Sequence, residues 1–114
     1  MPRNDDKLYL TDMVMAADDI AEFIAGYYRE TFLSDKVTQS AVIQKIITIG
    51  EAANAVSAEL KARHPTVDWS GVIRMRNRVT HGYRTISHRI VWDVATQDIP
   101  ILRDQVNDIL KAEF

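Results

Sequence analysis

The chain has 114 residues, no cysteine, three histidines and a formal net charge of −2 at pH 7. This length predicts one domain, residues 1–114, with a single hydrophobic core. The lack of cysteine excludes disulfides and thiolate chemistry, and three scattered histidines offer no metal-ligand spacing, so we expect neither a metal nor a cofactor. Mild acidity argues against a protein that coats nucleic acid, because sequence-independent affinity grows with the number of phosphates neutralised, but it leaves a local RNA site open.

The sequence does not indicate a membrane location. No charged and then apolar leader opens the chain, and no apolar run approaches the roughly 18 residues that a membrane-spanning helix needs. The expected location is therefore the cytoplasm.

Helical periodicity dominates the chain. Apolar residues recur every three or four positions, glycine and proline are scarce, and no segment alternates as a strand would, so we predict an all-α fold. The first predicted helix covers about residues 5–28, with acidic residues on its other side. Its predicted buried stripe consists of Tyr9, Met13, Ala16, Ile20, Ile24 and Tyr27.

The second predicted helix runs from about residue 37 to residue 63 and is expected at the centre of the bundle. Ser34 or Asp35 is its expected N-cap. Gly50 stands in mid-helix, where glycine costs about 1 kcal/mol relative to alanine, so we expect another helix to approach closely there. The predicted buried stripe consists of Val42, Ile46, Ile49, Ala53, Val56 and Leu60, widened by Ile43 and Ile47.

A turn is predicted over residues 64–68, because Pro65 disfavours helical backbone in the residue before it. Asp68 or Ser70 is then the expected N-cap of a third helix, and Gly82 is expected to end that helix. The expected buried face of the third helix consists of Val72, Met75 and Val79.

The last helical stretch is predicted from about residue 88 to residue 110. Thr85 or Ser87 is its expected N-cap. Pro100 lies inside this stretch and lacks the N–H that an intact helix requires, so the helix should kink or split near Ile99. We therefore expect a bundle of four to five helices.

Positive charge is concentrated between Trp69 and Trp92. This segment contains five arginines and no acidic residue, so the rest of the chain must sum to about −7. Within it, Arg76-Asn77-Arg78-Val79-Thr80-His81-Gly82-Tyr83 brings together a guanidinium, an amide, an imidazole and a phenol, which are suited to handling phosphate. The arginines are Arg74, Arg76, Arg78, Arg84 and Arg89, and two of the three histidines, His81 and His88, also lie here.

Helical geometry separates the two most reactive groups of this motif. Arg76 and His81 are five residues apart and diverge by about 140 degrees on an ideal helix, so one helix cannot bring both to the same atom. Either the helix ends near Thr80 and lets His81 swing back, or a second copy of the chain completes the site. Both routes place the candidate chemistry at the end of the third helix.

An imidazole beside a guanidinium fits RNA cleavage in which a ribose 2'-hydroxyl attacks its own phosphate. The reaction needs one proton taken, one proton given and positive charge facing the phosphorus, and it needs no metal. His81 and Arg76 are the candidates for these roles. One histidine cannot easily perform both proton transfers, which favours two copies in a dimer. Candidate contacts to substrate phosphates are Arg78, Arg84 and Arg89.

Structural explanations of the same residue types stay open at this point. A histidine at a helix end often caps carbonyl groups, and an arginine-rich segment is often solvated or paired with acids. The expected packing groups are Tyr83, Trp69, Trp92, Tyr27 and Tyr28, and the histidines expected to be incidental are His64 and His88.

The motif resembles a known pattern. Residues 76–83 fit Arg-x4-His followed by x-Tyr and are similar to the signature of the HepT-like branch of the HEPN superfamily. The combined order of matching segments is more specific than Arg-x4-His alone, and the resemblance runs from about residue 41 to residue 110. The other matching segments are Ile49-Gly50-Glu51-Ala52-Ala53, Trp69, Met75 directly ahead of Arg76, and Val91-Trp92.

The resemblance implies an all-α, HEPN-type up-and-down bundle that forms a homodimer, with the two motif copies facing each other as a metal-independent ribonuclease. It also implies the toxin of a type VII-like toxin-antitoxin pair, whose partner is a nucleotidyltransferase antitoxin that silences the site by attaching AMP. Carried over to this chain, Arg76 and His81 become catalytic, Asn77 supports the site and Tyr83 is the AMPylation target. AMP beside His81 would place negative charge where substrate phosphate binds.

We therefore expect a cytoplasmic HepT-like ribonuclease toxin that acts on RNA as a dimer. Arg78 is basic where the family pattern demands no basic residue, so its role is open. The main alternative is a non-catalytic helical partner that binds a nucleotidyltransferase or a nucleotide through the same surface. Motif-dependent RNA cleavage by the purified protein distinguishes the two.

Overall fold

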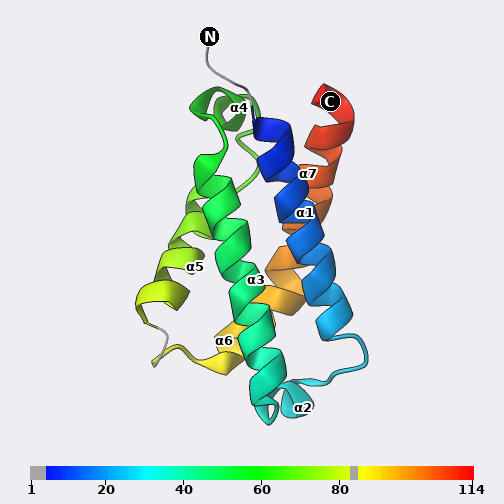
Figure 1. The fold of residues 1–114 in the computed structure, drawn as a ribbon, viewed down its shortest axis with the longest axis vertical. Helices are drawn as coiled ribbons and strands as arrows, with labels where there is room; N and C mark the ends of the chain where they lie inside the picture. The colour runs from blue at the N-terminus through cyan, green and yellow to red at the C-terminus, as the bar shows by residue number, and fades with distance from the viewer. Residues whose placement is uncertain (1–4, 83–84) are drawn as a thin grey trace.

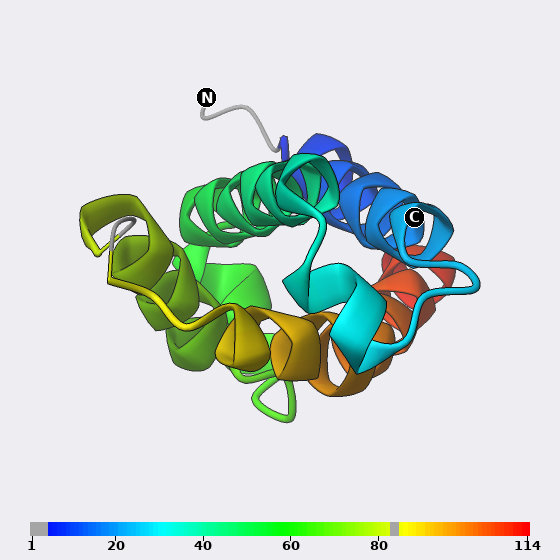
Figure 2. The same ribbon diagram turned by 90° about the horizontal axis from the view of Figure 1, so that it is seen from below.

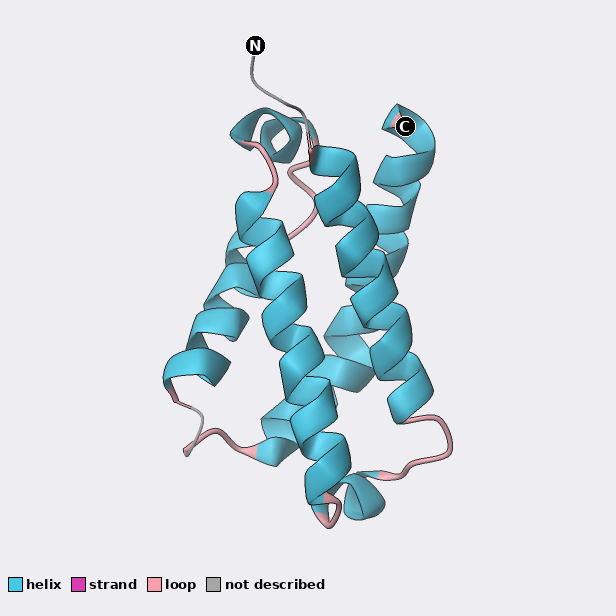
Figure 3. Ribbon diagram, in the orientation of Figure 1, coloured by secondary structure: helices cyan, strands magenta, loops and turns pink. Residues whose placement is uncertain are grey.

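The computed structural model describes residues 5–82 and 85–114, which Figure 1 draws as a bundle of helices. Every regular element in these residues is helical, as the colouring in Figure 3 shows. The all-α prediction is therefore confirmed. The elements are α1 (Asp6–Phe23), α2 (Arg29–Leu33), α3 (Lys36–Ala55), α4 (Ala58–Arg63), α5 (Trp69–His81), α6 (His88–Asp93), the π-helix η1 (Val94–Asp98) and α7 (Ile99–Glu113).

Four long helices, α1, α3, α5 and α7, build the bundle, and the short elements connect them. α1 and α3 lie side by side in opposite directions, α5 packs against α3, and α7 packs against α1 (Figure 1). Seen from below in Figure 2, α5 lies at the edge of the bundle, with α3 as its main neighbour. The central place predicted for the second helix is confirmed for α3. No helix in the described ranges is long and apolar enough to cross a bilayer.

The hydrophobic core follows the predicted helical spacing. In α1 the core residues Met13, Ala16 and Ile20 belong to the predicted stripe. α1 is shorter than predicted, because it ends at Phe23 and the chain then turns at Gly26, whose φ of 80° suits glycine. All six residues of the main stripe predicted for the second helix are buried, namely Val42, Ile46, Ile49, Ala53, Val56 and Leu60.

The prediction of one helix from residue 37 to residue 63 is wrong, because α3 and α4 are separate helices. The break lies at Ser57, whose backbone N–H and hydroxyl donate to the buried Asp6 carboxylate at 2.8 and 2.6 Å. The Ser57 oxygen also accepts a hydrogen bond from Leu60 N at 3.2 Å and caps α4. A contact with the distant start of α1 therefore sets this break. The short helix α2 was also not predicted.

The split predicted at Pro100 is confirmed. The last helical stretch divides into α6, η1 and α7, and the N–H of Ile99 donates to the carbonyl of Val94, which is the wide hydrogen-bond register of a π-helix. Pro100 has no N–H with which to continue a regular α-helical ladder, so the wide turn accommodates it. The predicted N-cap Ser87 caps α6 through its side-chain oxygen.

Ionic contacts tie the end of α7 to the end of α4. Glu113 accepts two hydrogen bonds from Arg63, one from Nη2 at 2.7 Å and one from Nε at 3.3 Å. The Nε2 atom of His64 also contacts Glu113. The Arg63 hydrogen bonds, and after them the His64 contact, lower the pKa of Glu113 from 4.5 to about 2. The expectation that His64 is incidental is therefore wrong.

We expect the substitution Glu113→Gln to lower the melting temperature by an amount that depends on pH. The folded-state pKa of Glu113 lies below its ordinary value of 4.5, so the carboxylate stabilises the fold above that pH and loses this contribution as the pH falls towards about 2. The difference in melting temperature between parent and variant should shrink between about pH 5 and about pH 2. Thermal unfolding followed by circular dichroism measures it, and a difference that grows as the pH falls would contradict the assignment.

Candidate active site on α5

α5 carries the predicted motif, and local contacts fix both of its ends. Asp68 caps the start by accepting a backbone N–H of the first turn at 3.0 Å, as predicted. The indole N–H of Trp69 donates to the carbonyl of His64 at 3.0 Å and holds the first turn against the preceding loop. At the other end, the N–H of Gly82 donates to the carbonyl of Arg78 at 2.9 Å, and the predicted helix end at Gly82 is confirmed.

The apolar face of α5 is only partly covered. Val79 is fully buried, whereas Val72 and Met75 are half-buried, so the predicted face is correct but not completely enclosed. α5 lies at the edge of the bundle in both Figure 1 and Figure 2. A small, mostly apolar hollow of about 140 Å³ opens between α3, α5 and η1. α5 therefore presents apolar side chains that the described residues do not fully cover.

Arg76 is set directly against α3 at Gly50. A Cβ atom on Gly50 would lie 2.1 Å from Arg76 Cβ and 2.6 Å from Arg76 Cγ, so only glycine leaves room for the arginine stem. The close helix approach predicted at Gly50 is therefore confirmed. The Nε atom of Arg76 is buried and has no hydrogen-bond partner among residues 5–82 and 85–114. Such an unpaired donor lowers the stability of the fold by about 1–3 kcal/mol. Its presence therefore needs a reason other than stability.

His81 and Asn77 are exposed on α5 and form no hydrogen bond with Arg76. α5 ends at His81, one residue beyond Thr80, so His81 is the last helical residue before the turn at Gly82. The divergence of about 140 degrees between Arg76 and His81 therefore persists in the folded chain. On an ideal helix, one copy of the chain would not bring these two groups to the same atom.

The arginines of the basic segment have no acidic partner within the part of the chain that the structure describes. Arginines elsewhere do pair, as Arg103 does with Asp18 at 3.0 Å. An acid-paired surface therefore does not explain this segment. Tyr83 and Arg84 lie outside the described residues, so their predicted roles stay predictions. Besides Arg76, the arginines in question are Arg74, Arg78 and Arg89, all exposed.

Most aromatic residues near the motif pack, as expected. The Trp69 side chain is buried, and the rings of Trp92 and Phe32 lie 5.3 Å apart between centroids. Tyr28 is 72% exposed, so its expected packing role is wrong.

The Nδ1 atom of His88 is buried without a partner among the described residues. His88 belongs to α6 rather than to α5, so it is not part of the motif helix.

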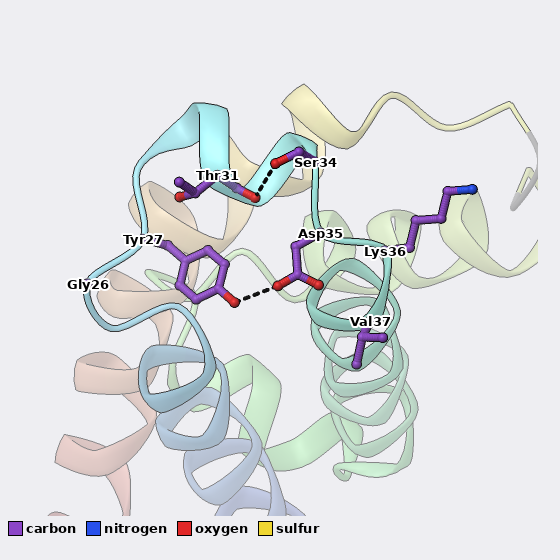
Figure 4. Close-up of a pocket in the computed structure, with 7 residues that line it drawn as sticks. All are labelled: Gly26, Tyr27, Thr31, Ser34, Asp35, Lys36 and Val37. Atoms are coloured by element: carbon purple, nitrogen blue, oxygen red, sulfur yellow. Dashed lines mark hydrogen bonds between the residues drawn. The ribbon is translucent and has the colours of Figure 1, made fainter.

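A groove of about 730 Å³ lies beside α2, and none of its lining residues belongs to α5. Figure 4 shows the Tyr27 hydroxyl pointing at Asp35, to which it donates at 2.6 Å. Asp35 also accepts the backbone N–H of Thr38 at 3.0 Å and caps α3, as predicted. The Tyr27 hydrogen bond, followed by the Thr38 bonds, lowers the pKa of Asp35. These groups hold the α3 terminus, so α5 remains the better candidate site.

Comparison with known proteins identifies the family. The profile of the family described as "Ribonuclease HepT-like" matches residues 13–109. "Probable ribonuclease HepT" of Thermococcus cleftensis is 36% identical over 92% of this chain and 96% of its own length. "Putative RNase MJ0127" of Methanocaldococcus jannaschii is 32% identical over 97% of this chain and 92% of its own length. No solved structure gives a significant match. Because the profile and these alignments cover nearly the whole chain, the protein belongs to the HepT-like ribonuclease family of the HEPN superfamily.

Proposed function

We propose that this protein is a metal-independent ribonuclease whose active site forms between two copies of α5 in a homodimer. The observation that carries the proposal is Arg76, whose stem is fixed against Gly50 while its buried Nε has no partner in the described residues. A guanidinium held in this way, among arginines that have no acidic partner in the described residues, is suited to binding phosphate. Membership of a ribonuclease family supports RNA as the substrate.

The dimer follows from the geometry of the motif. Arg76 and His81 diverge around α5, so a reacting phosphate that contacts both needs a second helix. The half-buried Val72 and Met75 leave apolar surface on the same helix for such a contact. A closed twofold arrangement would bring the same α5 surface of each copy to the interface.

The proposed reaction is transesterification within the RNA strand. One His81 imidazole takes the proton of the ribose 2'-hydroxyl, whose oxygen then bonds to the adjacent phosphorus. The bond from phosphorus to the 5'-oxygen breaks, and the partner copy's imidazole returns a proton to that leaving oxygen. Arg76 faces the negative charge that develops on the phosphoryl oxygens. The products are a 2',3'-cyclic phosphate and a 5'-hydroxyl.

The remaining motif residues have supporting roles in this proposal. Asn77 is one turn before His81 on the exposed side of α5 and supports the site through its amide. Arg78, Arg84 and Arg89 contact phosphates along the strand rather than the reacting one. These contacts position the RNA without reading its sequence.

Incubation of the purified, unmodified protein with RNA in the presence of EDTA tests the proposed activity. Cleavage that leaves 2',3'-cyclic phosphate ends and depends on the motif would support a metal-independent ribonuclease. Loss of cleavage with EDTA and its return with a divalent cation would overturn the metal-independent mechanism. An absence of cleavage under both conditions would favour the non-catalytic partner instead.

We further propose that the protein is the toxin of a type VII-like pair and that a nucleotidyltransferase antitoxin attaches AMP to Tyr83. Tyr83 follows the helix end at Gly82 by one position in the sequence. An AMP group there would add negative charge beside His81 and compete with substrate phosphate.

Co-expression with the nucleotidyltransferase should raise the mass of the protein in steps of one AMP group. Tyr83→Phe should abolish the addition and leave the circular dichroism spectrum unchanged. Mass spectra that place the label on another residue would contradict the assignment of Tyr83.

A further inference from the structure

Gly50 occupies a position where glycine is locally unfavourable. It lies inside α3, more than one turn from either helix end, and is buried. Alanine normally stabilises such a mid-helix position relative to glycine, because glycine has more conformational freedom to lose. The presence of glycine here therefore needs a tertiary reason.

That reason is a contact with the first atoms of the Arg76 side chain. A Cβ on Gly50 would lie 2.1 Å from Arg76 Cβ, 2.6 Å from Arg76 Cγ and 3.4 Å from Arg76 Cα. These atoms are bonded to or near the backbone of α5, so they cannot swing away as the end of a flexible side chain would. Any side chain at residue 50 must therefore push α5 away from α3.

The same contact fixes the position from which the Arg76 side chain extends towards its guanidinium group. Arg76 is half-buried, and its Nε is buried without a partner among residues 5–82 and 85–114. The stem is thus enclosed by α3, while the more distal part of the guanidinium is the part left to reach a phosphate. A displacement of about 1 Å at a catalytic group can cost roughly 100-fold in rate, so the shape of this contact matters for catalysis.

We propose that Gly50 is a positioning residue for Arg76, and that its lack of a side chain sets the geometry with which Arg76 meets the reacting phosphate. The inference rests on the proposed ribonuclease function. Gly50 touches no reacting atom and acts only through Arg76. Its effect is therefore on turnover rather than on the electrostatic attraction of RNA, which the exposed Arg78 and Arg89 supply.

The kinetic test compares Gly50→Ala with a matched substitution on the same helix, Ser40→Ala, at an exposed position. Gly50→Ala should lower kcat by about 10-fold to 100-fold and change KM for RNA much less, whereas Ser40→Ala should leave both near the parent values. A folded Gly50→Ala protein with the parent kcat overturns the proposal. If the parent itself cleaves no RNA, the proposed function fails first.

A stability cycle tests the contact independently of any activity. Gly50→Ala should lower the melting temperature, which is the opposite of the usual mid-helix effect. In an Arg76→Gly background, where Cβ and Cγ are absent, the same substitution should lose most of this penalty. If Gly50→Ala alone does not fold, the double variant should fold whenever Arg76→Gly does. The proposal is overturned if Gly50→Ala lowers the melting temperature equally in both backgrounds. It is also overturned if the double variant does not fold although Arg76→Gly does.

Discussion

Replacement of His81 by alanine is expected to lower the rate of RNA cleavage by about 10² to 10⁴. His81 is exposed at the last residue of α5 and makes no hydrogen bond to a described residue. Its loss should therefore change the free energy of unfolding by less than about 1 kcal/mol. Single-turnover cleavage assays and urea unfolding of the same preparations measure the two effects separately.

His64→Ala is the matched control for this substitution. The His64 imidazole contacts Glu113, so it has a structural role away from the motif. This control should lower stability and leave cleavage by the folded protein intact. If His81→Ala cleaves RNA as well as the parent, or loses activity only by unfolding, the enzyme reading fails and a binding partner remains.

Arg76→Lys is expected to lower turnover by about 100-fold or more, although it keeps the positive charge. Lysine lacks the planar fork that can bind two phosphoryl oxygens, and removal of one well-placed donor commonly costs this much. The fold should not suffer, because a methylene group replaces the buried Nε that has no partner in the described residues. The substitution therefore separates catalysis from stability.

Kinetics and thermal unfolding of Arg76→Lys should be compared with those of Arg103→Lys. Arg103 pairs with Asp18 on the surface and lies outside the motif, so its replacement should leave turnover unchanged. Full turnover by Arg76→Lys would show that charge alone suffices at this position. A loss of turnover that simply follows a loss of folded protein would also contradict the proposed role.

Local sequence signals predicted those features that depend on neighbouring residues. Asp35, Asp68 and Ser87 cap the helices that follow them, Gly82 ends α5, and Pro100 divides the last helical stretch. Each of these effects arises from backbone donors, or their absence, within one turn of the residue. The spacing of apolar residues gave the core stripe of α3 for the same reason.

Features that depend on distant residues could not be predicted in this way. The break at Ser57 depends on the carboxylate of Asp6, which no local pattern contains. Gly50 predicted that another helix approaches α3 closely, but the sequence did not identify Arg76 as the residue that contacts it. The pairing of His64 with Glu113 was missed because it joins α7 to the loop after α4.

For the candidate site, the sequence predicted the residue types and the angle by which Arg76 and His81 diverge around the helix axis. It left open whether His81 turns back at the end of α5 or a second copy completes the site, and in the structure His81 is the last helical residue. The edge position of α5 and its partly covered apolar face come only from tertiary packing (Figure 2). These two observations support the proposal that a second copy of the chain completes the site.

The central claim is that two copies of the motif form one site, and subunit mixing tests it most directly. Parent and His81→Ala subunits are exchanged at fixed total concentration, native mass spectrometry verifies the mixed dimers, and RNA cleavage is measured. If both imidazoles serve one site, activity follows the square of the parent fraction and falls to about one quarter at equal amounts. Activity that falls only in proportion to the parent fraction, to about one half at equal amounts, would contradict a site that needs both His81 imidazoles.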